Sequence, residues 1–179
     1  MNPEPIRLTG TSYAVLSLLE HLGPATPYDL KQALESSIEN FWPVPHTTFY
    51  AEPARLAKSG FLSVHQEAGG RRRKLYALTE QGRDALHEWT RSPEVGPPQL
   101  REEGVLKIFA GADPVPIMRA RRDWHRGKLE ELEGYLRNVG EEEHLRGIRG
   151  SLLVGTTYHR LLLEAIERFL ADQAATGSS

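Results

Sequence analysis

The feature of this sequence that most restricts its fold is a change of hydrophobic period after Gly60. Before that glycine, apolar residues recur every three or four positions, which predicts helices. From 61 to 78, in "FLSVHQEAGGRRRKLYAL", they alternate instead, and a Gly-Gly pair divides the stretch in two. This pattern predicts a β-hairpin with strands near 61–67 and 74–78.

Three helices are predicted before the hairpin. The first covers about 11–22. The second begins after Thr26, which suits an N-cap because a proline follows it at the first helical position. The third begins near His46 or Thr47, since the prolines of "WPVP" favour extended backbone before it, and it ends at Gly60.

A fourth helix follows the hairpin. Thr79 is expected to cap it, although Gly82 replaces the Glu or Gln that would complete a capping box. Ala85, Leu86 and Trp89 are expected to cover the small core. Three helices, a hairpin and a helix predict a winged helix-turn-helix, in a chain that is mainly α.

This order gives the third helix a function. In helix-turn-helix proteins the second helix of the motif enters the major groove with its N-terminal residues at base edges, and Thr47 and Thr48 stand at that end. The hairpin tip carries Arg71, Arg72 and Arg73, which would meet phosphates. A helix cap and a solvated loop are the simpler explanations of the two patterns. Their order along the chain favours DNA binding.

The third helix contains an anomaly at Pro53. Phe49, Pro53 and Leu56 are expected to face the core. Pro53 cannot donate to the carbonyl of Phe49, which costs about 3 kcal/mol inside a regular helix. Either the helix is kinked there, which we favour, or its regular part begins only near Glu52. The residues expected to point outward are Thr48, Ala51, Glu52 and Arg55.

The run "FWPVPHTTFYAEPARLAKSGFLSVHQEAGGRRRKLYALTEQGRDAL", preceded by "PATPYDLKQAL", resembles the DNA-binding domain of PadR-family transcriptional regulators. The "FWPV" lead-in, the tyrosine of the third helix, the turn after it and the "RKYYxLTxxG" wing carry the resemblance, which covers about 8–90. It implies a homodimeric bacterial regulator, usually a repressor. Pro53 departs from the pattern, since the family usually has leucine there.

The resemblance also implies roles for individual residues. Tyr28 and Tyr50 would lie near the DNA backbone with Lys31 as a helper, although core packing is the other explanation for both tyrosines. Arg73, Lys74 and Tyr76 stand where the wing motif has its basic and aromatic residues. The predicted DNA-binding residues are Tyr28, Lys31, His46, Thr47, Thr48, Tyr50, Arg71, Arg72, Arg73 and Lys74.

The breaker-rich segment "TRSPEVGPPQ" predicts a domain boundary, with a DNA-binding domain at 1–90 and a helical domain at 91–179. A helix of about a dozen residues is expected in "QLREEGVLKIFAGA". A longer one at 114–139 would be capped by Asp113, and the last would run from about 142 to 172.

The last helix carries an apolar seam with the spacing of a coiled coil. We expect this seam to form a homodimer, because a helix-turn-helix dimer presents two heads one DNA turn apart. Its residues are Leu145, Ile148, Leu152, Gly155, His159, Leu162, Ile166 and Phe169. The polar His159 would be a pH or ligand sensor, or a hydrogen-bonded register device, the interpretation we favour.

Trp124 and Tyr158 suggest an effector pocket. Relatives in the resembled family bind small aromatic molecules with their C-terminal domain, and these two rings could line such a site. Packing alone is the alternative that we favour.

Composition narrows the classes of function that this chain can have. The net charge is −2, so DNA binding must rest on local clusters, and the absence of cysteine excludes disulfides and the usual zinc sites. No leader or apolar run near 18 residues is present, which predicts a cytoplasmic protein that does not contact membranes. Neither "EEEH" nor "DWH" has a second half, so we expect no enzyme, metal or cofactor.

These patterns together predict a homodimeric regulator that binds an inverted-repeat operator in double-stranded DNA. The alternative is a winged helix that serves only protein interactions, which Glu52 on the third helix and the near-neutral charge would suit. Such a module would not need "GGRRRK".

Overall fold

The computed structural model describes residues 6–35, 37–38, 41–45, 47–66 and 72–176, and gives no side-chain description for 144. The chain divides into two compact units, Met1–Gly96 and Pro97–Ser179. It is mainly helical with a two-stranded antiparallel hairpin, as predicted from the sequence.

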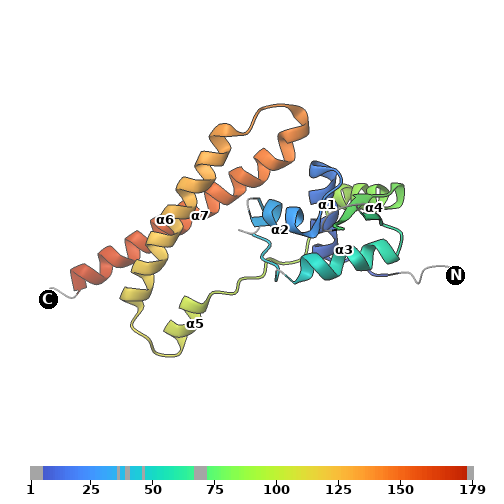
Figure 1. Ribbon diagram of the computed structural model, residues 1–179. Coiled ribbons are helices and arrows are strands. Elements are labelled where there is room, and N and C mark those ends of the chain that lie inside the picture. Colours follow the sequence, from blue (N-terminus) through green and yellow to red (C-terminus); the bar gives the residue numbers. More distant parts are fainter. Residues whose placement is uncertain (1–5, 36, 39–40, 46, 67–71, 177–179) are drawn as a thin grey trace. The chain divides into compact units, whose positions relative to one another are not determined.

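The first unit has the predicted order of elements (Figure 1). They are α1 (Gly10–Leu22), α2 (Pro27–Glu35), α3 (Thr48–Lys58), β1 (Leu62–Gln66), β2 (Lys74–Leu78) and α4 (Glu80–Arg91). The core joins all of them, because each contributes buried apolar side chains. Among its fully buried members are Val15, Leu16, Leu30, Leu34, Phe49 and Leu56.

The hairpin is fixed to the helices by a backbone contact that the sequence pattern did not predict. Its register pairs Leu62 with Leu78 and Val64 with Tyr76. Ala25, just before α2, extends this sheet: its N–H donates to the Tyr76 carbonyl at 3.0 Å, and the Tyr76 N–H donates back at 2.9 Å. The wing is therefore attached directly to the start of α2.

Two predicted helix caps of this unit are present. The Thr26 hydroxyl accepts the Asp29 N–H at 3.3 Å, and the Asp29 carboxylate accepts the Thr26 N–H at 2.9 Å. These bonds to Thr26 lower the pKa of Asp29. At α4 the Thr79 hydroxyl accepts the Gly82 N–H at 3.1 Å. Both helices thus begin where local chemistry predicts.

Trp89 corrects one expectation about α4. Leu86 is buried as predicted, but Trp89 is 46% exposed. Its ring lies parallel to that of Tyr13, with centroids 4.4 Å apart. Tyr13 itself packs against the core. Trp89 therefore covers the edge of the core through a stacked aromatic pair instead of entering it.

The helix α3 runs without interruption from Thr48 through Pro53. The alternative in which the regular helix begins only near Glu52 is therefore wrong. Phe49, Pro53 and Leu56 are fully buried, as predicted, and this burial offsets the backbone hydrogen bond that Pro53 cannot form. The kink at Pro53 stays a prediction.

The second unit contains α5 (Glu103–Phe109), α6 (Pro114–Asn138), a 3₁₀ turn η1 (Glu143–Leu145) and α7 (Arg146–Thr176). Asp113 caps α6 as predicted, with its carboxylate accepting the Val115 N–H at 3.0 Å. α5 is shorter than expected and is followed by Gly111 with a φ of 98°. Along the described stretches of the chain, every helix is too short or too polar to cross a bilayer.

The predicted seam on α7 makes contacts inside its own chain, because α6 and α7 pack side by side (Figure 1). A Cβ on Gly155 would lie 3.2 Å from the Leu132 Cδ1 of α6, and His159 contacts His125 of α6. At least this part of the seam is thus intramolecular, which corrects the expectation that a second subunit covers it. Sequence periodicity identifies an apolar face but does not identify the helix that covers it.

Candidate nucleic-acid interface

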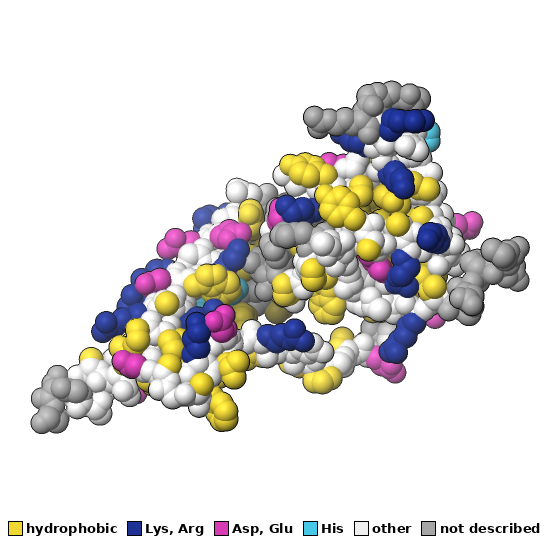
Figure 2. Space-filling view, turned by 60° about the horizontal axis from the view of Figure 1, so that its bottom comes forward, with side chains coloured by type: hydrophobic (Ala, Val, Ile, Leu, Met, Phe, Trp, Pro, Cys, Tyr) yellow, Lys and Arg dark blue, Asp and Glu magenta, His cyan; other side chains and the backbone are white. Residues whose placement is uncertain are grey.

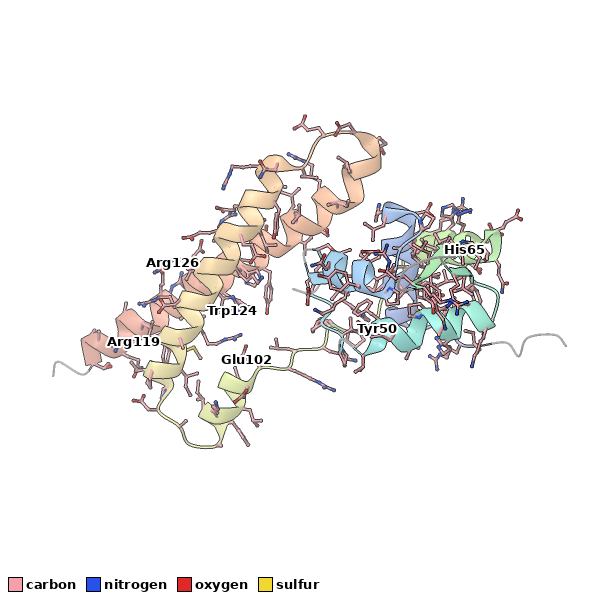
Figure 3. All side chains as sticks on the ribbon, viewed as in Figure 1. Tyr50, His65, Glu102, Arg119, Trp124 and Arg126 are labelled. Carbon is pink, nitrogen blue, oxygen red and sulfur yellow. The ribbon has the colours of Figure 1, made fainter. Side chains whose placement is uncertain are left out.

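The start of α3 presents polar groups outward. Thr47 occupies the N-cap position with helical backbone angles, is exposed, and makes no capping hydrogen bond with its side chain. The capping explanation of this threonine is therefore wrong. Thr48, the first helical residue, is partly exposed. Tyr50 projects from the same turn and is 58% exposed (Figure 3).

The beginning of α2 adds a tyrosine and a lysine to this surface. Tyr28 is 56% exposed, so core packing explains neither it nor Tyr50. The Lys31 ammonium lies 3.0 Å from the Glu35 carboxylate, which raises the pKa of Lys31, with smaller contributions from Tyr28 and Tyr50. Because such contributions fall with distance, both phenols lie near Lys31. The structure thus brings these three predicted residues together.

The described part of the wing is exposed and basic. Arg72, Arg73 and Lys74 are all exposed, and Arg72 has a φ of 47°, which L residues rarely adopt. Arg73 lies near enough to Asp29 of α2 to contribute to the lowered pKa of that carboxyl. Figure 2 shows Lys and Arg side chains around the end of the hairpin. Two predicted contacts, His46 and Arg71, lie outside the described residues.

Tyr76, the aromatic residue of the wing motif, does not belong to this surface. It is only 3% exposed and pairs with Ala25 through its backbone. Its role is therefore to anchor the wing within the core.

Glu52 is not directed outward as expected. Its side chain is only 12% exposed. Its carboxylate accepts a hydrogen bond from the Ser12 hydroxyl of α1 at 2.7 Å and forms an ion pair with Arg55 at 2.6 Å. The charge that argued against DNA binding is thus compensated inside the unit. The partners are 40 residues apart in the sequence, so no helical pattern could have shown this contact.

In the second unit, four aromatic rings gather between α6 and α7. The Nδ1 atoms of His125 and His159 lie 2.8 Å apart, and both side chains are buried. Trp124 projects from the middle of α6 (Figure 3) and meets both imidazoles edge-on, while Tyr158 packs against them from α7. Trp124 and Tyr158 each remain 47% exposed.

Residues 15–88 match the sequence model of the "Transcriptional regulator PadR-like family". This match supports the resemblance to PadR-family regulators that was predicted for the N-terminal part of the chain. A relative, the "Negative transcriptional regulator PadR" of Bacillus subtilis (strain 168), is 26% identical over 129 residues, which cover 68% of this chain and 70% of the relative.

Solved structures share the PadR-like fold. Bacillus subtilis PadR in complex with operator DNA superposes with a TM-score of 0.77 at 21% identity, over 93% of this chain and 99% of that one. Bacillus subtilis PadR in complex with p-coumaric acid gives a TM-score of 0.70 at 22% identity, over 89% and 96% of the two chains. At these identities the two structures show the fold, and they confirm the winged-helix prediction.

His125 is the residue of this PadR-like chain that the sequence reasoning missed. Its partner His159 was singled out, and the favoured interpretation of that residue, a hydrogen-bonded device, agrees with the contact between the rings. The pair joins positions 34 residues apart, and only the antiparallel packing of two helices creates it. Of the residues with described placement, no three His, Cys, Asp or Glu form a group that could hold a metal ion.

Acid is expected to destabilise the packing of α6 on α7. Burial, followed by the charges of His159 and Arg121, lowers the pKa of His125 from 6.5 to about 4, and Glu102 opposes this. The unfolded chain therefore binds more protons than the folded one between these values, so stability falls as the pH drops from 6.5 towards 4. We expect a loss of up to about 3 kcal/mol, measured by thermal unfolding with circular dichroism.

The control for this prediction is His125→Gln, which cannot titrate. Its stability should depend less on pH across the same interval. An identical decline in the variant and the unmodified chain would contradict the assignment.

Proposed function

We propose that this PadR-like regulator is a homodimeric repressor that binds an inverted-repeat operator, with the first turn of α3 in the major groove and the wing on phosphates. The observation that carries the proposal is the surface at the start of α3, where Thr47 and Tyr50 are exposed and Tyr50 contributes to the raised pKa of Lys31 of α2. Hydroxyls and an ammonium at a helix N-terminus suit base edges and phosphates. The Bacillus subtilis relative is named a negative regulator and was solved with operator DNA.

The attachment of the wing supports the same proposal. The two hydrogen bonds between Ala25 and Tyr76 set the hairpin against the segment that begins α2. Lys74 begins β2 directly after Arg72 and Arg73, and Arg73 lies near enough to Asp29 of α2 to contribute to the lowered pKa of that carboxyl. A basic wing held at a fixed distance from the recognition helix can contact the phosphates adjacent to the groove.

A second copy of the chain would dimerise through α7. Part of the predicted seam contacts α6, but α7 also exposes an apolar row beside it. Its members Leu153, Val154, Tyr158 and Leu161 are 48%, 72%, 47% and 59% exposed. Together with the partly exposed seam positions, this row would give the dimer an apolar contact.

A small aromatic effector is a further part of the proposal. Bacillus subtilis PadR was solved with p-coumaric acid. In this chain Trp124 and Tyr158 offer half-exposed rings, and the Arg121 guanidinium lies 5.0 Å from the Trp124 ring centre. Arg121 is paired with Glu102, so an effector carboxylate that bound it would replace the Glu102 carboxylate. We assign the regulator no catalytic reaction and place its activity in the cytoplasm.

Selection of genomic fragments bound by the full chain tests the proposal. We expect an imperfect inverted repeat with half-sites about 10 base pairs or a multiple apart, because two-fold symmetric heads require it. Repeating the selection with p-coumarate should reduce the recovered fragments. A direct repeat, or recovery without any shared sequence, would contradict the dimeric repressor.

A further inference from the structure

We propose that Ser12, Glu52 and Arg55 form a clamp that sets the direction of the first turn of α3 at the DNA, in place of the backbone bond that Pro53 removes. Arg55 is then a positioning residue and does not read bases, although it is the arginine of the recognition helix. The inference rests on the proposed DNA binding and names what fixes its geometry. We call these three residues the α1–α3 clamp.

The clamp is a closed set of hydrogen bonds. The buried Ser12 hydroxyl donates to Glu52 Oε1 at 2.7 Å and accepts from Arg55 Nη2 at 3.0 Å. Arg55 also binds both carboxylate oxygens of Glu52, Nε to Oε2 at 2.9 Å and Nη2 to Oε1 at 2.6 Å. A bidentate guanidinium–carboxylate pair holds both side chains in one orientation.

The serine end of the clamp is itself fixed. The Thr9 N–H donates to the Ser12 hydroxyl oxygen at 2.8 Å, and the Ser12 N–H donates to the Thr9 hydroxyl at 3.3 Å. This is the capping box that begins α1. Glu52 and Arg55 are thereby attached to a buried serine that is itself hydrogen-bonded within a helix terminus.

The clamp lies where α3 lacks a backbone bond. Pro53 has no N–H to give to the carbonyl of Phe49, so the hydrogen-bond ladder is interrupted between the first turn and the rest of the helix. Glu52 and Arg55 stand on either side of this proline. Their bonds to α1 therefore constrain the same turn that carries Thr48 and Tyr50 outward.

Electrostatics agrees with this geometry. The Arg55 guanidinium, together with the Ser12 hydroxyl, lowers the pKa of Glu52, and Glu52 raises the pKa of Arg55. Both groups are therefore charged at neutral pH. Three donor contacts of the guanidinium are directed into the protein, which leaves it poorly oriented for the bidentate contact with guanine that a base-reading arginine makes.

Glu52→Gln separates a positioning role of Glu52 from simple repulsion of phosphate, because the two roles predict opposite changes in operator affinity. If the clamp orients α3, affinity for the selected operator should fall about tenfold, with nonspecific affinity and the salt slope unchanged. If Glu52 only repels DNA, the affinity for the operator and the affinity for a nonspecific duplex should both rise, which would overturn the inference. Glu20→Gln, the same charge change at an exposed position of α1, is the control and should alter operator affinity less than twofold.

Pro53→Leu supplies the coupling test. Leucine restores the backbone N–H, so in the Pro53→Leu chain Glu52→Gln should lower operator affinity only about twofold. Arg55→Lys should behave like Glu52→Gln in the unmodified background, because an ammonium cannot make the bidentate pair. Equal losses with and without Pro53 would overturn the inference. An unchanged sequence preference of Pro53→Leu would remove the predicted kink.

Hydrogen exchange tests the clamp without DNA. Glu52→Gln in the full chain should speed exchange of the α3 amides about tenfold relative to those of α4. Unchanged exchange would overturn the clamp even in a protein that binds its operator. If the unmodified chain selects no DNA, the proposed function fails, while the exchange result still decides whether the clamp exists.

Discussion

Replacing Arg71, Arg72 and Arg73 together by glutamine is expected to lower operator affinity about a thousandfold at low salt and to flatten its salt dependence. Three phosphate contacts per wing make six in a dimer, which corresponds to a slope of log affinity against log salt of roughly −5. Removing these contacts removes the counterion release that produces the slope. Fluorescence anisotropy with a labelled operator across a salt series measures both quantities.

The matched control removes arginines from α4. Arg83 and Arg91 are exposed in the same unit, and their replacement by glutamine should change the slope by less than one. A wing variant that keeps full affinity and an unchanged slope would contradict the phosphate role. The winged helix would then be better explained as a protein-interaction module.

Gly82→Ala should destabilise the first unit by about 2 to 3 kcal/mol, since the added methyl group has no room. A Cβ there would lie 2.2 Å from the Phe61 carbonyl oxygen and 3.2 Å from Leu78 Cδ2. That carbonyl cannot move freely, because it accepts the Thr79 N–H at 3.2 Å and the Thr79 hydroxyl at 3.0 Å. The start of α4 and the segment between α3 and β1 would be pushed apart.

Urea unfolding followed by circular dichroism measures this loss. Gly127→Ala is the control, because it lies within α6 and a Cβ there meets nothing within 4 Å. That change should be neutral or should stabilise by up to about 1 kcal/mol through helix propensity. A free energy of unfolding of the Gly82→Ala chain within about 0.5 kcal/mol of that of the unmodified protein would show that α4 can shift without loss of stability.

Local chemistry made much of this fold predictable from the sequence. Thr26, Thr79 and Asp113 cap helices that begin at the expected places, because a cap depends on neighbours within four residues. The hairpin followed from alternation around a turn. The incomplete capping box at Gly82 was also visible in the sequence, but the Phe61 carbonyl that leaves no room for a Cβ there was not.

Contacts between distant segments account for what the sequence did not show. Glu52 lies on the outward side of a helical projection, yet it is directed towards Ser12 because α1 packs against α3 at that level. His125 and His159 meet only because α6 and α7 lie side by side. The seam was recognised as apolar, but its period does not distinguish a helix of the same chain from a second subunit.

The most direct test of the account is the native mass of the complex between the full chain and a duplex recovered by genomic selection. A homodimeric regulator predicts the mass of the duplex plus about 40 kDa, twice the 20.1 kDa of one chain. It also predicts that a duplex with scrambled half-sites forms no such species at the same protein concentration. One chain per duplex, or equal binding to both duplexes, would contradict the account.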